Sequence, residues 1–525
     1  MTARANFWLT VATAIVLQAV VLYFAYTEGI TSKMIPWDEC EYVFNGLMNV
    51  SELKSLGVSA VPDLTFVHSP ISYLQITSML FVSGNRVSAP YLLNVLYVFL
   101  FLYAISRSLR GFGVAPVLAF WLMAVSLPLV FLFSSHLKAD YLAGCFSFVM
   151  LVELFILDNS TARRLALGTV LACCTVLSKP MAFYVPGLTG FVFAATLFRD
   201  AATGRLEWRR FSSLVPYVMA GIVPIGVFAV DAVPNLDYFV TYIKQALSPP
   251  WVADVGLLPR LGYYLPVPNG EDPGWFGFWG WGFVCFILLG VVFLASALRK
   301  LVRQNDLITI LALVAIAGAA YVPLVVSPQL QKPFGSIFAG TVLAAFLCAY
   351  RTLKRDMQRS YILDWGLIAA GVACFRLPVE VPQAVIPSAP QNIAEATRIL
   401  RQFTTDMAAP NAPPNPSLYF SYSPIPYPDF GTWFYLSTGR FPYSMDEPLS
   451  DNKDEIRNGV RSADYVIVWD AKPTESDSQW RTVMHATANT ILQIPNLQEA
   501  DQLPFAGGRY VLFRVAKDRS TASRD

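Results

Sequence analysis

Three carboxylates lie within four positions of the chain, shortly after its first apolar run. Asp38, Glu39 and Glu41 would repel one another at a membrane surface. The flanking Trp37 and Tyr42 are residue types that favour the membrane–water interface. A carboxylate in such a place of low dielectric can act as a general base. The alternative is the first turn of an amphipathic helix, where acidic residues favour the helix dipole. The spacing leaves both interpretations open.

Metal-binding chemistry has weaker support in the sequence. A zinc site would have to use the only three histidines, His68, His136 and His485, and is disfavoured. His136 also fits an ordinary residue of the membrane interface. Asp38 and Asp140 could hold a divalent cation, so metal dependence is left open.

The composition decides what kind of protein positions these residues. The chain has 525 residues, of which 55% are hydrophobic and 14% charged, whereas soluble proteins average about 25% charged residues. The net charge of +2 gives no reason to expect nucleic acid. The seven cysteines are odd in number and lie mostly in apolar runs, which excludes a disulfide scaffold, and they show no CxxC metal spacing. The sequence therefore predicts an α-helical polytopic membrane protein.

About eleven apolar runs are long enough to be transmembrane helices, each needing about 20 residues. The first is an anchor and not a removed signal peptide, because no Ala-x-Ala cleavage signal follows it. The predicted spans are 7–26, 88–106, 112–132, 141–157, 165–178, 181–197, 211–230, 277–297, 306–326, 334–350 and 361–376. Residues 71–82 are too short to cross and predict a helix in the interface.

Basic residues orient this array. With the N-terminus in the cytoplasm, the short inner segments hold 16 Lys and Arg in about 50 positions, and the outer loops hold 8 in about 125. This bias follows the positive-inside rule and predicts a multi-pass protein of the inner (plasma) membrane. The outer side then holds the loop 27–87 and the segment after Phe375. Function concentrates in such loops, so any chemistry is expected outside.

The last part of the chain differs in composition. A Pro-rich linker leads into residues with helical spacing from Asn392 to Met407 and into three runs typical of buried strands, beginning at Ser417, Ala463 and Gly508. We predict two domains: a transmembrane module over 1–376 and a periplasmic mixed α/β domain over 377–525.

Four motifs in order resemble the GT-C glycosyltransferases, most closely the protein O-mannosyltransferase and lipid A aminoarabinose transferase group. They are Asp38-Glu39-x-x-Tyr42 after the first helix, His68-Ser69-Pro70, Lys138-Ala139-Asp140-Tyr141 and Leu177-Ser178-Lys179-Pro180. The resemblance covers about residues 7–200 well and the rest in layout. Ser69 departs from the second proline of the mannosyltransferases, which weakens the case for a protein acceptor.

The resemblance implies an inverting membrane glycosyltransferase that moves a sugar from a polyprenyl-phosphate donor to a lipid, glycan or protein acceptor on the outer face. Asp38 would be the general base, with Glu39 as a supporting catalytic residue. Glu41, Tyr42, His68, His136 and Asp140 would position the donor or acceptor. The group resembled mostly works without a catalytic metal.

Charge that grows on the leaving phosphate must be met by cations. The candidates near predicted outer helix ends are Lys179, Lys138, Arg86, Arg260 and Lys332. Lysine or arginine at a membrane surface binds phosphate without a nucleotide site, and no Walker loop, GxGxxG or Asp-x-Asp motif stands out. The alternative for each is a side chain that snorkels from a helix end to the interface.

Two other functions fit a polytopic chain with basic loops. A transporter or flippase of lipid-linked sugars would show internal repeats and binding residues at mid-membrane. The predicted spans hold almost no ionisable residue, Glu153 being the main exception, which favours surface chemistry. A polysaccharide polymerase or ligase of another fold would have its large catalytic loop late in the chain. Membrane lipids are expected partners in every case.

Overall fold

The computed structural model describes most of residues 3–202 and 282–516. The longer gaps within these ranges are 28–36, 61–68, 128–135, 327–334, 375–389 and 447–452, and only scattered residues are described between 203 and 281. The described chain forms two compact units. The first comprises Met1–Ala25, Thr65–Gln75 and Ala89–Val385, and the second comprises Tyr26–Leu64, Ile76–Ser88 and Ile386–Asp525.

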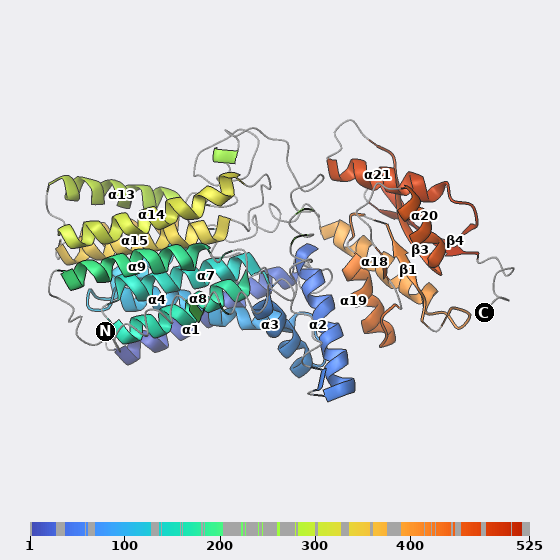
Figure 1. The fold of residues 1–525 in the computed structure, drawn as a ribbon, viewed down its shortest axis with the longest axis horizontal. Helices are drawn as coiled ribbons and strands as arrows, with labels where there is room; N and C mark the ends of the chain where they lie inside the picture. The colour runs from blue at the N-terminus through green and yellow to red at the C-terminus, as the bar shows by residue number, and fades with distance from the viewer. Residues whose placement is uncertain are drawn as a thin grey trace. The chain divides into compact units, whose positions relative to one another are not determined.

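The first unit is a bundle of apolar helices. Figure 1 shows α4, α7, α8, α9, α13, α14 and α15 running alongside one another. Its elements are α1 (Ala3–Thr27), η2 (Ala89–Leu93), α4 (Asn94–Ser108), α5 (Val114–Val125), α7 (Ala139–Leu151), η3 (Val152–Ile156), α8 (Thr161–Ser178), α9 (Tyr184–Ala202), α13 (Phe283–Leu298), α14 (Gln304–Val326), α15 (Ser336–Asp356) and α16 (Tyr361–Cys374).

Ten of the eleven predicted spans coincide with one of these helices, and almost all of the eleventh, 211–230, lies outside the described residues. Among the described residues, five helices are long and apolar enough to cross a membrane, and four further apolar helices are shorter. The predicted fold class, a helical polytopic membrane protein with a small α/β domain, is therefore confirmed.

Burial differs strongly among these helices. Of the most apolar 18-residue window in each span, 94% is buried in Ala139–Ile156 and 83% in Ser336–Asp356, but only 28% in Ala3–Tyr23. In α1, Trp8 and Val16 are more than half exposed. Large apolar side chains on the surface of a bundle are expected where lipid surrounds it, so α7 and α15 form the centre and α1 lies at the edge.

The second unit combines helices near the N-terminus with the C-terminal α/β domain. Its helices are α2 (Trp37–Leu56), the later part of α3 (Pro70–Ser83), α18 (Pro390–Met407), α19 (Tyr427–Thr438), α20 (Lys453–Ser462) and α21 (Gln479–Leu492). Its strands are β1 (Leu418–Phe420), β2 (Met445–Asp446), β3 (Tyr465–Ala471), β4 (Leu497–Phe505) and β5 (Gly508–Val515).

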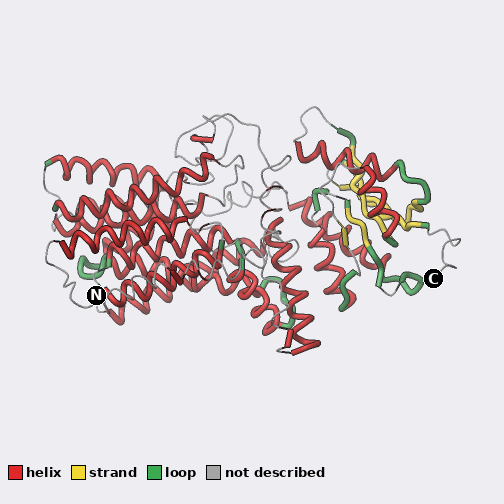
Figure 2. Tube along the Cα trace, in the orientation of Figure 1, coloured by secondary structure: helices red, strands yellow, loops and turns green. Residues whose placement is uncertain are grey.

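The five strands form one mixed sheet, seen in yellow in Figure 2, in the order β2-β1-β3-β5-β4. β1 pairs in parallel with β2 and β3, and β5 pairs antiparallel with β3 and β4. Side chains alternate along the strands, so Ile467 packs with α18 and α19 while Val466 packs with α20 and α21. The sheet is thus covered by helices on both faces. The predicted helix 392–407 and the three predicted strands are all present.

Candidate active site

The acidic segment predicted to supply the base begins helix α2. Asp38 and Glu39 lie in its first turn, where the helix dipole favours carboxylates; the Asp38 side chain lies outside the described residues. Glu39 is fully buried, whereas Glu41 is exposed and Tyr42 is buried. Because buried carboxylates in proteins are generally paired, Glu39 is suited to a fixed, supporting position.

A lysine and an aspartate meet where α7 begins and α8 ends. Lys179 directly follows α8, and its Nζ lies 3.3 Å from both carboxylate oxygens of Asp140 in the first turn of α7. The Lys179 amide donates to the Thr175 carbonyl, and the Lys179 carbonyl accepts from the Ala182 amide. The side chains are 22% and 11% exposed. This cation is held in place at a helix end by its backbone and by a carboxylate.

A buried hydrogen-bond network includes His136, which shortly precedes Asp140 in the chain. The Asn94 amide nitrogen donates to the His136 carbonyl, and Gln75 donates to the Asn94 amide oxygen, both over 2.9 Å. The Tyr97 hydroxyl donates to the Gln75 amide oxygen over 2.8 Å. The His136 ring lies 5.7 Å from the ring of Tyr141. This network fixes the segment that leads into Asp140.

Sequence reasoning missed Gln75, Asn94 and Tyr97. The sequence feature that could have identified Gln75 and Asn94 is an amide side chain in an otherwise apolar helix, because such an amide must find a partner within the protein. Gln75 stands in the apolar stretch 71–82 and Asn94 in the predicted span 88–106.

The structure describes the other predicted cations to different degrees. Arg86 belongs to the second unit and is exposed in the turn after α3, where its amide donates to Ser83. Arg260 is half-buried within a part of the chain that is mostly not described. The predictions for Lys138, Lys332 and His68 lie outside the described residues.

Glu153, the exceptional ionisable residue of the predicted spans, is paired. It lies in η3, accepts from Arg107 over 2.5 Å and from Asn159 over 2.8 Å. Its charge is balanced by this cation, which links the ends of α4 and η3.

Within the described part of the chain, no group of three His, Cys, Asp or Glu side chains is arranged to hold a metal ion. Asp140, one of the two aspartates considered as cation ligands, forms an ion pair with Lys179.

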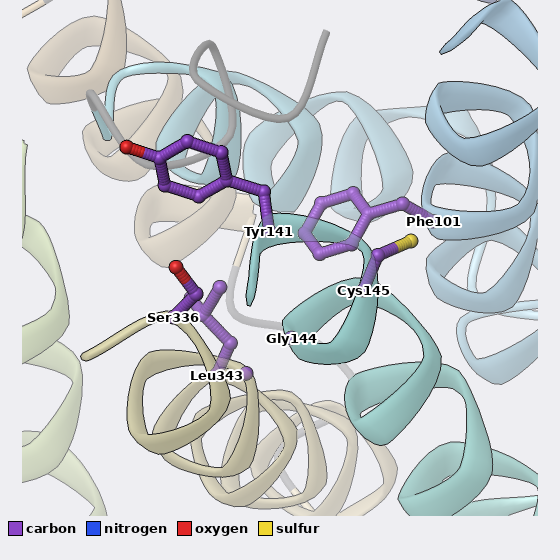
Figure 3. A pocket seen from close by; sticks show the side chains of 7 residues that line it. Phe101, Tyr141, Gly144, Cys145, Ser336 and Leu343 are labelled. Atoms are coloured by element: carbon purple, nitrogen blue, oxygen red, sulfur yellow. The ribbon is translucent and has the colours of Figure 1, made fainter. Parts of the chain in front are cut away.

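A small cavity lies among α4, α7 and α15, lined by Tyr141 and Ser336 among others (Figure 3). Its volume of about 10 Å³ is the size needed for a single water molecule. Figure 3 shows the Tyr141 and Phe101 rings above α15 in this view. This cavity results from close helix packing and is too small to hold a sugar.

Comparison with solved structures shows the fold of this chain. The crystal structure of ArnT from Cupriavidus metallidurans in the apo state matches 97% of this chain and 98% of its own, with a TM-score of 0.58 and 14% identity. The structure of ArnT from the same organism bound to undecaprenyl phosphate matches 98% and 99%, with a TM-score of 0.54 and 14% identity. No family model and no curated protein matches the sequence. The predicted GT-C fold is confirmed, over nearly the whole chain.

Proposed function

We propose that this protein is a membrane glycosyltransferase that moves a sugar from a polyprenyl-phosphate donor to an acceptor at the outer face of the membrane. The observation that supports this most is the fold match over 97% of the chain to ArnT, together with the matching ArnT structure that holds undecaprenyl phosphate. Undecaprenyl phosphate is the group that such a transferase releases when the sugar leaves.

The ion pair of Lys179 and Asp140 supports a phosphate site. When the bond between the sugar carbon and the phosphate oxygen breaks, the electron pair and its negative charge pass to the phosphate. An ammonium group has three N–H donors, so it can bind a carboxylate and a phosphate together. Lys179 would stabilise this negative charge, and its side chain would not first have to become ordered, because Asp140 already fixes its position. Lys138, Arg86, Arg260 and Lys332 remain proposed as further cations.

The start of α2 would supply the base. In this mechanism Asp38 takes the proton of the acceptor hydroxyl, whose oxygen then bonds to the sugar carbon on the face opposite the phosphate and inverts it. Glu39, fully buried one residue further along, would hold this turn in place. Glu41, Tyr42, His68 and His136 are proposed to position the substrates. The proposal includes the membrane orientation predicted from the basic residues, with the N-terminus in the cytoplasm and the C-terminal domain outside.

A deletion strain tests the proposal. Mass spectrometry of its envelope should show that one sugar substituent is lost and that the corresponding undecaprenyl-phosphate sugar accumulates. Complementation with the wild-type chain should reverse both changes. An unchanged set of envelope sugars and donor lipids would contradict the proposed function, and the missing substituent would identify the sugar and the acceptor.

A further inference from the structure

Helix α2 packs against α19 of the C-terminal domain through an aromatic side chain and a glycine. Phe44 of α2 is buried, and a Cβ atom added to Gly431 of α19 would lie 2.4 Å from its Cε2. Phe441 meets the Phe44 ring edge to face, with centroids 5.4 Å apart, and itself stacks on Tyr435 at 4.3 Å. The Phe44 ring is therefore enclosed, and only glycine leaves room for it at position 431.

The other side of α2 is held by α3. A Cβ atom on Gly46 would lie 2.6 Å from Ile76 Cγ2, and the Asn49 amide donates to the Thr77 hydroxyl over 3.3 Å. Phe44 and Gly46 are two residues apart, which is roughly 200° around a helix. Helix α2 is thus packed against α19 and α3 on two nearly opposite sides, at Gly431 of α19 and at its own Gly46.

We propose that Phe44 and Gly431 are positioning residues, through which the C-terminal domain sets the place of the helix that begins with Asp38 and Glu39. This rests on the proposed function, in which that turn supplies the base. Phe44 follows Asp38 by six residues, less than two helical turns, so a helix displaced at Phe44 moves its first turn as well. A displacement of about 1 Å at a catalytic group can cost about a hundredfold in rate.

The test compares Gly431→Ala with Gly366→Ala, a helical glycine of α16 with open space around its Cβ position. Release of undecaprenyl phosphate is measured at saturating undecaprenyl-phosphate sugar with an envelope extract as acceptor, and binding of undecaprenyl phosphate is measured separately. We expect Gly431→Ala to lower kcat by about tenfold to a hundredfold with unchanged lipid binding. Gly366→Ala should match the wild type.

The double variant Gly431→Ala/Phe44→Leu shows whether the contact itself is responsible, because the smaller side chain makes room for the added methyl group. It should recover part of the lost kcat, a non-additive effect expected of residues in contact. Phe44→Leu alone adds no clash and tests the same contact if Gly431→Ala fails to fold; it should also lower kcat.

Three results would overturn the inference: wild-type kcat in Gly431→Ala or Phe44→Leu, no recovery in the double variant, or a parallel loss of undecaprenyl phosphate binding. Asp38→Asn, measured beside them, keeps the proposed function separate. If Asp38→Asn is inactive while Gly431→Ala is fully active, the result supports Asp38 as the base and contradicts the positioning role of Gly431. If Asp38→Asn is active, the proposed base itself fails.

Discussion

At the scale of single residues, Lys179 has two possible roles, a side chain that snorkels into water or the proposed phosphate ligand. A snorkelling side chain extends its ammonium into water, but the Lys179 ammonium lies 3.3 Å from the Asp140 carboxylate and its side chain is 22% exposed. The pair limits the directions in which the ammonium can point, which suits a site that must meet a phosphate at a defined place.

Lys179→Met should weaken binding of undecaprenyl phosphate by about ten- to a hundredfold, because a charge-assisted contact contributes about 1.5–3 kcal/mol. Lys179→Arg should keep part of the affinity, since a planar fork replaces a compact ammonium. The double variant Lys179→Met/Asp140→Asn removes the unpaired carboxylate that Lys179→Met leaves behind. We expect it to regain thermal stability but not lipid binding. Wild-type affinity in Lys179→Met would remove this residue from the site.

Asp38→Asn should lower turnover by about a hundredfold or more, because it removes a general base and keeps the shape of the side chain. The purified variant should elute and unfold like the wild type and bind undecaprenyl phosphate equally well. Glu41→Gln, at an exposed position of the same helix, is the matched comparison and should lose less. A variant that retains more than about a tenth of the rate is incompatible with Asp38 as the base.

Residue types predicted the candidates, but not their partners. Lys179 and Asp140 are 39 positions apart and meet only because α7 and α8 are neighbours. The same holds for Gln75 and Asn94, whose hydrogen bond depends on where two helices lie. A motif therefore indicates which groups are available, while pairing follows from packing that no single-sequence pattern contains.

At the scale of elements, α7 and α15 approach until their backbones touch. A Cβ atom on Gly144 would lie 2.6 Å from the Ser336 carbonyl oxygen, and one on Gly340 would lie 2.5 Å from the Gly144 carbonyl oxygen. Small residues allow such approach, which in membranes supplies much of the packing energy between helices. Since α7 begins at the Lys179 and Asp140 pair, this contact also supports the candidate phosphate site.

Gly340→Ala should destabilise the protein by about 1–3 kcal/mol, as overpacking does, because the obstructing atom belongs to the backbone and cannot rotate away. Gly318→Ala, in α14 with nothing near its Cβ position, is the control. Thermal unfolding in one detergent measures the difference. Equal unfolding midpoints for Gly340→Ala and Gly318→Ala would show that α7 and α15 can move apart to accommodate the methyl group without loss of stability.

The contact of α18 with β4 predicts a pH dependence. Burial raises the pKa of Asp406 above its ordinary value of 3.8, and the neighbouring Asp501 raises it further. The folded state therefore binds this proton more tightly than the unfolded chain does. Protonation of Asp406 makes its whole contribution to stability below the pKa of the unfolded chain, and this contribution is lost as the pH rises through the pKa of the folded state.

Asp406→Asn should accordingly raise the unfolding midpoint of the full chain near neutral pH, and this advantage should vanish as the pH is lowered through the folded pKa toward the unfolded one. Asp454→Asn, at an exposed aspartate of α20, should show no such trend. Unfolding midpoints across a pH series provide the measurement. An advantage that grows toward acid pH would reverse the assigned sign.

The elements themselves were predictable to different degrees. Long apolar runs predicted the spanning helices because hydrophobic length is a strong signal. The strand β4 was not predicted, since its sequence is polar and its side chains are mostly exposed. β2, with two residues, is too short to leave a pattern. Helix α19, which packs against Phe44 of α2 through Gly431, is apolar and aromatic, and was not predicted either.

At the scale of the whole molecule, the chain shares a fold with ArnT at 14% identity. Apolar side chains can replace one another where only lipid or a helix core surrounds them, so the fold persists when most residues differ. The four motifs indicated the fold from the sequence alone. They could not indicate that α2 and the C-terminal domain belong to one compact unit, because that contact joins Phe44 to Gly431 and Phe441, nearly 400 positions away.

The proposed transfer of a sugar from a polyprenyl phosphate can be followed with the purified protein in one assay. The full-length protein is incubated with doubly labelled undecaprenyl-phosphate sugars, comprising a hexose, a pentose and an aminopentose, and with an envelope extract as acceptor. With one of these donors, we expect equal amounts of released undecaprenyl phosphate and of sugar bound to the acceptor, and neither product with Asp38→Asn. Release of undecaprenyl phosphate together with free sugar would indicate hydrolysis. If no donor is turned over, but the protein reconstituted in vesicles moves the intact donor across their membrane, the function is transport. Either result would show that the protein is not a glycosyltransferase that uses this donor.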